Sequence, residues 1–268
     1  MVTDEQLAKA KEFIFRHGRL LDRKYFLFHF GGASPDAALD ALLCYQNPDG
    51  GFGHGLDPDI MCPASTAIAT EVGMAYLEGL GITDGDVVDC VEDWIVSAQQ
   101  EDGSIRHPHA DVTAYPHAAW WEENSGSGLA LAGFLGKWGR GSAEFFARAE
   151  KAFTTQGIPG ELGKYNYPLY MYLRYSPDAE NHSSALARVR EMIPAMLDKY
   201  APHHSLFVFP TRWYSEDLDR DLVEVKAKAV VADLQEDGGL KIPYDLPWWR
   251  PIWTLQVLVS LKTCGLIG

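Results

Sequence analysis

Apolar residues recur along much of the chain at the three- and four-residue spacing of an α-helix. The first such stretch runs from Thr3 to Leu21, and Thr3 with Gln6 matches the pattern of a capping box at its start. Ser34 followed by Pro35 indicates the start of a second helix. No segment shows the sustained alternation of apolar and polar residues that is typical of a β-strand. The pattern therefore predicts an all-α protein.

A short polar motif recurs between the predicted helices. It reads QNPDGGF at residues 46–52, QEDGS at 100–104 and QEDGGL at 235–240. In each copy an Asp-Gly step follows a glutamine, and the glycine can take the positive φ that ends a helix. Because a catalytic group is seldom needed once in every repeat, we interpret the motif as structural. Its recurrence after about 50 residues predicts repeated pairs of helices.

These motifs, together with the later segment WTLQVLVSLKTCG, resemble the repeats of the squalene/terpenoid cyclase and protein prenyltransferase β-subunit superfamily. The resemblance implies an (α/α) toroid, in which inner helices surround a central cavity and outer helices surround them. The inner helices would begin near Thr3, Ser65, Ser125, Lys164 and Arg250, and the outer helices near Ser34, Thr83, Ser142, Asn181 and Ser215. We predict one toroid domain of five to six helical hairpins over residues 1–268. The helix over Arg250–Cys264 would pack beside the helix over Thr3–Leu21 to close the ring.

The composition narrows the class of protein. With 47% hydrophobic residues among 268, the chain can form a sizeable core, and its net charge of -14 disfavours contact with nucleic acid or anionic lipid. The N-terminus lacks the basic and apolar regions of a secretory signal, and no apolar run approaches the roughly 18 residues of a membrane span. The four cysteines show no CxxC spacing, which favours free thiols. We expect a cytoplasmic protein.

Residues that can carry chemistry gather in the loops that would lead into the inner helices. Parallel inner helices would bring these loops to one rim, where helix N-termini favour anionic groups. The catalytic candidates are Asp57 and Asp59, two residues apart in the first loop, and His117 in the second. The ligand-binding candidates are His54, His107, His109, Tyr115, Trp120, Trp121, Tyr244, Asp245, Trp248, Trp249 and Arg250. An aromatic pocket with a few convergent ionisable groups is typical of a small-molecule site.

The resemblance implies an isoprenoid-type apolar ligand in a central aromatic cavity. Class II terpene cyclases place a D-x-D-D run directly before a Thr-Ala pair, and its middle aspartic acid protonates an alkene or an epoxide. Here CPAS, residues 62–65, precedes Thr66-Ala67, so that acid is not at its expected place. Asp57 or Asp59 would then act as a general acid from the loop, and aromatic faces would stabilise a carbocation.

Other functions stay open. The pairs Trp120-Trp121 and Trp248-Trp249 are typical platforms for sugar rings, so a carbohydrate-active toroid, either a glycosidase or a lyase, is one alternative. A toroid that binds a small molecule or a protein without chemistry is another. Asp59 and Cys62 resemble two of the three zinc ligands of the prenyltransferases, but no third ligand is identifiable, so no metal is predicted. No phosphate loop or nucleotide fingerprint occurs, and no cofactor is predicted.

Overall fold

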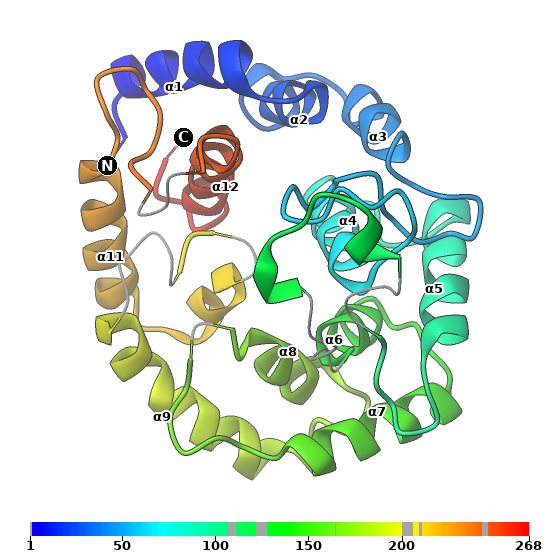
Figure 1. The fold of residues 1–268 in the computed structure, drawn as a ribbon. Helices are drawn as coiled ribbons and strands as arrows, with labels where there is room; N and C mark the ends of the chain where they lie inside the picture. The colour runs from blue at the N-terminus through cyan, green and yellow to red at the C-terminus, as the bar shows by residue number, and fades with distance from the viewer. Residues whose placement is uncertain are drawn as a thin grey trace. The chain divides into compact units, whose positions relative to one another are not determined.

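The computed structural model describes residues 2–106, 111–121, 128–163, 165–199, 206–208, 211–242 and 246–267, and every regular element within these ranges is helical (Figure 1). The α-helices are α1 (Asp4–His17), α2 (Leu20–Gly31), α3 (Asp36–Leu43), α4 (Ala67–Gly79), α5 (Asp86–Ala98), α6 (Leu129–Lys137), α7 (Ala143–Gln156), α8 (Tyr167–Tyr175), α9 (Ser183–Lys199), α11 (Arg220–Ala232) and α12 (Trp249–Thr263). Short 3-10 helices are η1 (Val112–Ala114), η2 (Ala119–Trp121) and η3 (Thr211–Asp217). The prediction of an all-α protein is confirmed.

The chain divides into two compact units. Unit 1 comprises residues 1–41 and 193–268, and unit 2 comprises residues 42–192. Within unit 1, α12 packs against α1 and α2, so the predicted contact between the helices nearest the two chain ends is confirmed. Within unit 2, α6 packs along α8 and also contacts α4 and α7. The prediction of a single domain over the whole chain stays a prediction.

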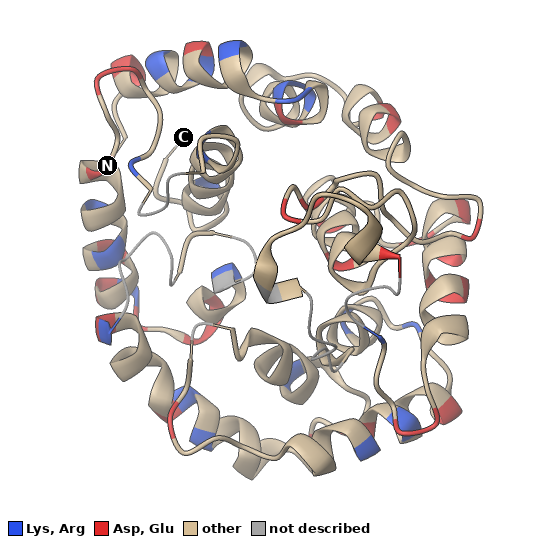
Figure 2. Ribbon diagram, viewed as in Figure 1, with Lys and Arg blue, Asp and Glu red and all other residues tan. Residues whose placement is uncertain are grey.

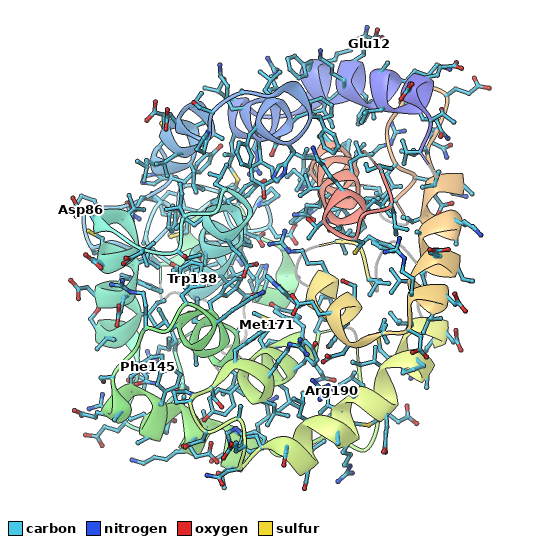
Figure 3. The ribbon with its side chains drawn as sticks, turned by 180° about the vertical axis from the view of Figure 1, so that it is seen from behind. Glu12, Asp86, Trp138, Phe145, Met171 and Arg190 are labelled. Atoms are coloured by element: carbon cyan, nitrogen blue, oxygen red, sulfur yellow. The ribbon has the colours of Figure 1, made fainter. Side chains whose placement is uncertain are left out.

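Two glycines let α6 and α8 approach each other closely. A Cβ atom on Gly133 would lie 2.7 Å from the backbone of Met171, which is labelled in Figure 3, and one on Gly136 would lie 2.1 Å from the carbonyl oxygen of Tyr175. The missing side chains therefore allow backbone contact between the two helices.

The helices fall into two kinds by burial. The whole run from Ala67 to Leu77 in α4 is buried, and so is the run from Leu129 to Leu135 in α6. In contrast, α1, α5, α7, α9 and α11 each have an exposed face, and Figure 2 shows charged residues along them. Figure 3 shows Glu12 and Asp86 at such exposed positions. A helix that is apolar all round belongs in a core, whereas a one-sided stripe indicates a helix that covers one.

The N-terminal prediction needs two corrections. The capping box at Thr3 and Gln6 is present, but the predicted helix from Thr3 to Leu21 is interrupted at Gly18 and a second helix begins at Leu20. In α1 only Ala10, Phe13 and Ile14 are buried, so its burial matches that of α5 and not that of α4, contrary to its prediction as an inner helix. The helix predicted to start near Ser215 starts instead at Arg220, after η3.

The recurring motif folds into the same turn in each copy. We call residues 46–52 turn 1, residues 99–105 turn 2 and residues 234–240 turn 3. Isolated β-bridges join the two ends of each turn, pairing Gln46 with Phe52, Gln99 with Ile105 and Leu234 with Leu240. The aspartates Asp49, Asp102 and Asp237 each accept a hydrogen bond, at 3.0, 2.9 and 3.0 Å, from the backbone N–H two residues later. The structural interpretation of the motif is confirmed.

When the three turns are aligned by their backbone hydrogen bonds, the glutamine of turn 1 is offset by one residue from the motif glutamines of turns 2 and 3. Gln46 matches Gln99 and Leu234, whereas the position of Asn47 is taken by Gln100 and Gln235. At that second position each backbone N–H donates to the carbonyl group four residues later. The repeated feature is therefore the Asp-Gly step, and the glutamine is not bound to one place in the turn.

Candidate functional site

The two loops that were predicted to supply acids and histidines lie side by side in unit 2. Ile60 and His117 form an antiparallel bridge, and the backbone N–H of Met61 donates to the carbonyl group of Pro116 at 3.0 Å. At this junction a buried apolar cluster forms, with Trp121 packed against it, and its members are Ile60, Cys62, Ile68 and Val112. The predicted proximity of the two loops is confirmed, because backbone hydrogen bonds join them.

Asp57 and Asp59 occupy different environments. The Asp57 side chain is buried, and its Oδ1 accepts the backbone N–H of Asp59 at 2.9 Å. Asp59 is only half-buried, and its backbone carbonyl accepts the N–H of Ala118 at 2.8 Å. Burial makes a carboxyl group sensitive to its neighbours, so Asp57 is the stronger candidate of the two for acid–base chemistry.

A further carboxyl group, on Glu71, belongs to this site. Glu71 lies on α4 with 7% of its surface exposed, and its Oε1 is buried with no hydrogen-bond partner in the part of the chain that the structure describes. The pKa of Glu71 is raised to about 8, chiefly by burial; a hydrogen bond from Tyr167 on α8 opposes the shift, and the charge of Asp57 adds to it. Glu71 is therefore protonated at neutral pH, and a second buried acid, Asp57, acts on it through its charge.

The sequence contains a signal for Glu71. It is the only charged residue in the buried run from Ala67 to Leu77. An ionisable residue seldom lies on a fully buried helix unless it is paired or functional. The predicted site residues lie mostly in loops, whereas Glu71 lies within a helix, so the prediction did not include it.

The histidines and the tyrosine of the two loops have local partners. His54 has a positive φ of 56°, and its Nε2 lies 2.9 Å from Oδ1 of Asn47. The Nδ1 atom of His117 lies 2.7 Å from the carbonyl oxygen of Tyr115, whose ring is partly exposed. His54 and His117 therefore help to hold the shape of their own loops.

The remaining predicted residues lie in unit 1 or outside the described ranges. His107, His109, Tyr244 and Asp245 lie outside the described residues, as does the side chain of Trp120. Trp248 is 49% exposed, whereas the Trp249 ring packs 6.0 Å from that of Trp253. Arg250 donates from Nη1 and Nη2 to the Asp237 carboxylate at 2.7 Å each. Its side chain is thus engaged in holding turn 3.

A second polar cluster in unit 2 has the composition of a catalytic triad but not its geometry. The Ser176 hydroxyl lies 2.9 Å from Nδ1 of His182, and Nε2 of His182 lies 2.9 Å from Glu150, which also accepts the Tyr172 hydroxyl at 2.7 Å. In a hydrolytic triad Nε2 contacts the serine. Ser176 and His182 are both buried. The cluster therefore fastens the start of α9 to α7 and α8.

Within the described ranges, no group of three or more His, Cys, Asp and Glu side chains is placed to hold a metal ion. Among the helices described, none has the length and apolar character required to cross a membrane. No protein-family model, curated protein or solved structure matches this chain.

Proposed function

We propose that unit 2 carries an acid–base site for an isoprenoid-type apolar ligand, with Glu71 as its general acid. The observation that carries the proposal is the buried carboxyl group of Glu71, whose pKa burial raises to about 8 and on which the charge of the buried Asp57 also acts. General acids are most effective when their pKa lies near the working pH, and burial next to a second acid is one way to reach it. The (α/α) toroid with a central cavity remains part of this proposal.

The proton would move from Glu71 to the ligand. On an epoxide it would bind the oxygen atom while a C–O bond breaks, and on an alkene it would form a new C–H bond, leaving a carbocation in either case. Loss of a proton from a neighbouring carbon would then form an alkene, and the Glu71 carboxylate would take up that proton. Ile68 lies three residues before Glu71, on the same side of α4, and belongs to the cluster against which Trp121 packs. The Trp121 ring can therefore stabilise nearby positive charge.

The test is incubation of the purified protein with squalene, oxidosqualene and linear prenyl diphosphates, followed by mass spectrometry of the products. We expect Glu71→Gln to abolish product formation, because an amide cannot donate the proton. Glu78→Gln on the same helix is the matched control, since Glu78 pairs with Lys137 at 3.1 Å in a contact outside the proposed site. If the wild-type protein neither converts nor binds any of these compounds, the proposal fails. Binding without conversion would support the non-catalytic alternative.

One observation favours a carbohydrate ligand as a second candidate. Trp248 keeps 49% of its surface exposed at the start of α12, and an exposed indole is a typical stacking surface for a sugar ring. We expect Trp248→Ala to weaken oligosaccharide binding while the melting temperature changes little, because the side chain contributes little to the core. Failure of the wild-type protein to bind oligosaccharides in calorimetry would exclude this candidate.

A further inference from the structure

A cavity of about 660 Å³ lies beside turn 1 in unit 2. Its lining includes Asn47, Asp49, Ser65, Trp94, Ser97 and Arg106. The volume falls within the range of small-molecule sites, and the lining combines one aromatic ring, one carboxylate and one guanidinium group. Neither the proposed acid site nor its chemistry uses this cavity.

Turn 3 provides an internal comparison for turn 1. The backbone N–H of Phe52 donates to Thr70 Oγ1 at 3.1 Å, and that of Leu240 donates to Thr254 Oγ1 at 2.8 Å, so the two turns are fastened to their following helices in the same way. The aromatic neighbours also correspond. A Cβ on Gly51 would lie 2.7 Å from the Trp94 ring, and one on Gly239 would lie 2.6 Å from the Phe13 ring. Trp94 therefore holds in turn 1 the place that Phe13 holds in turn 3.

In turn 3 a guanidinium group fills the space between the carboxylate and the aromatic ring. Arg250 donates to both oxygens of Asp237, and its Nε donates to the carbonyl group of Leu240 at 2.9 Å. Its guanidinium carbon lies 4.7 Å from the centre of the Phe13 ring. Charge-assisted hydrogen bonds to a carboxylate and a cation–π contact are the two interactions that arginine makes best.

Turn 1 has the same partners but lacks the arginine. Thr66 precedes Thr70 by four residues, as Arg250 precedes Thr254, and its short side chain instead caps α4 by accepting the Ala69 N–H at 3.2 Å. Asp49 Oδ1 accepts the Ser65 hydroxyl at 2.7 Å, while Oδ2 accepts no hydrogen bond within the described residues. A carboxylate oxygen and an indole ring therefore line the cavity where turn 3 has its guanidinium group.

We propose that the cavity beside turn 1 binds a small ligand with a guanidinium group, which pairs with Asp49 and stacks on Trp94 as Arg250 does in turn 3. Arg106 determines the other end of the ligand. It is exposed on the cavity wall, with no ion pair in the part of the chain that the structure describes, and it would repel a ligand that is only cationic. The best ligand therefore carries a carboxylate as well, as free arginine does.

The experiment is calorimetric titration of the full-length protein with L-arginine, agmatine and L-citrulline. Agmatine lacks the carboxylate of arginine, and citrulline has a neutral urea group in place of the guanidinium. We expect arginine to bind with a Kd of about 1 mM or lower, agmatine to bind more weakly, and citrulline not to bind. Equal binding of citrulline and arginine, or no binding of arginine and agmatine at about 10 mM, would overturn the proposal.

Three variants locate the site. Asp49→Asn keeps an oxygen that can accept the N–H of Gly51 but removes the charge, so arginine binding should weaken about tenfold or more. Asp102→Asn makes the same change in turn 2. Because Asp102 does not line the cavity, this variant should bind arginine as the wild-type protein does. Arg106→Gln should weaken arginine binding and strengthen agmatine binding. If Asp49→Asn binds arginine as the wild-type protein does, the site lies elsewhere.

Discussion

Turn 1 with α4 and turn 3 with α12 are built on the same plan, and three of the differences between them concern the proposed sites. Both have the Asp-Gly step, and both have a threonine that accepts the backbone N–H at the end of the turn. Thr66 stands where turn 3 has Arg250, Trp94 stands where it has Phe13, and Glu71 stands where α12 has Leu255. Leu255 is fully buried and apolar, whereas Glu71 is a buried acid.

The difference separates scaffold from site. Residues that the two regions share form the turn and fasten it to the next helix, and so they have a structural reason to recur. Residues that differ leave a cavity and a buried acid in unit 2, and neither stabilises that region. Comparing the two copies of a repeated turn thus separates structural residues from candidate functional ones. The comparison is useful because the fold alone does not specify a function.

The largest expected effect comes from removing the glycine that both regions share. Gly50 has a φ of 93°, and a Cβ there would lie 2.0 Å from the carbonyl oxygen of Cys90; Gly238 has a φ of 87°, and its Cβ would lie 2.3 Å from the backbone of Lys9. We expect Gly50→Ala and Gly238→Ala each to lower the free energy of unfolding by about 3 kcal/mol or more in urea denaturation.

Gly81→Ala is the control for the backbone conformation alone. Gly81 has a φ of 77° with no atom within 4 Å of its added Cβ, so its substitution should cost only about 1 kcal/mol. Equal losses at Gly50 and Gly81 would contradict the close backbone contact at turn 1.

The second effect tests the acid that only unit 2 has. The pKa of Glu71 is raised from 4.5 to about 8, so between these values the folded state holds a proton that the unfolded state has released. The free energy of unfolding must therefore fall as pH rises through this window, by about 3–4 kcal/mol between pH 5 and 8. Glu71→Gln should remove this part of the pH dependence and become more stable relative to the wild-type protein at pH 8. Parallel pH profiles for the two proteins would refute a buried, protonated Glu71.

The third effect tests whether the two turns are fastened in the same way. Thr70 and Thr254 are buried, and each accepts one backbone N–H of its turn. Valine has nearly the same shape but leaves that N–H without a partner, so Thr70→Val and Thr254→Val should each cost about 1–2 kcal/mol. Thr263→Val, at the exposed end of α12, is the control. A loss in one turn and not in the other would show that the turns are not equivalent.

The smallest effect is expected at the ion pair of turn 3. The hydrogen bonds from Arg250 lower the pKa of Asp237, so the pair stabilises the folded protein above the ordinary pKa of 3.8, and this stability is lost as pH falls through the lowered value. Because Asp237 is half exposed, we expect Arg250→Gln to cost about 1 kcal/mol at pH 7, with the gap closing towards pH 3. Unfolding by urea at several pH values measures it, and a gap that persists at the lowest pH would assign the loss to packing on Phe13.

Local signals in the sequence predicted much of the fold. The capping box at Thr3, the Asp-Gly turns and the start of a helix near Ser142 are confirmed, because each depends on hydrogen bonds between residues close in the chain. The break at Gly18 was missed because the apolar spacing continues across it, although a Cβ there would lie 2.7 Å from the Ile14 carbonyl oxygen. The spacing of apolar residues alone does not reveal that a single glycine ends the helix.

The candidate site depended more on tertiary contacts. By itself the sequence determined which segments are helices, where most of the turns lie, and that the loops before α4 and after α5 are rich in ionisable residues. Only the tertiary structure decided that Asp57 is buried while Asp59 is not, that Glu71 lies near Asp57 and Tyr167, and that Arg250 closes turn 3. The physical reason is that burial and charge pairing depend on groups far apart in the chain, whereas helix periodicity and turn formation depend on neighbours.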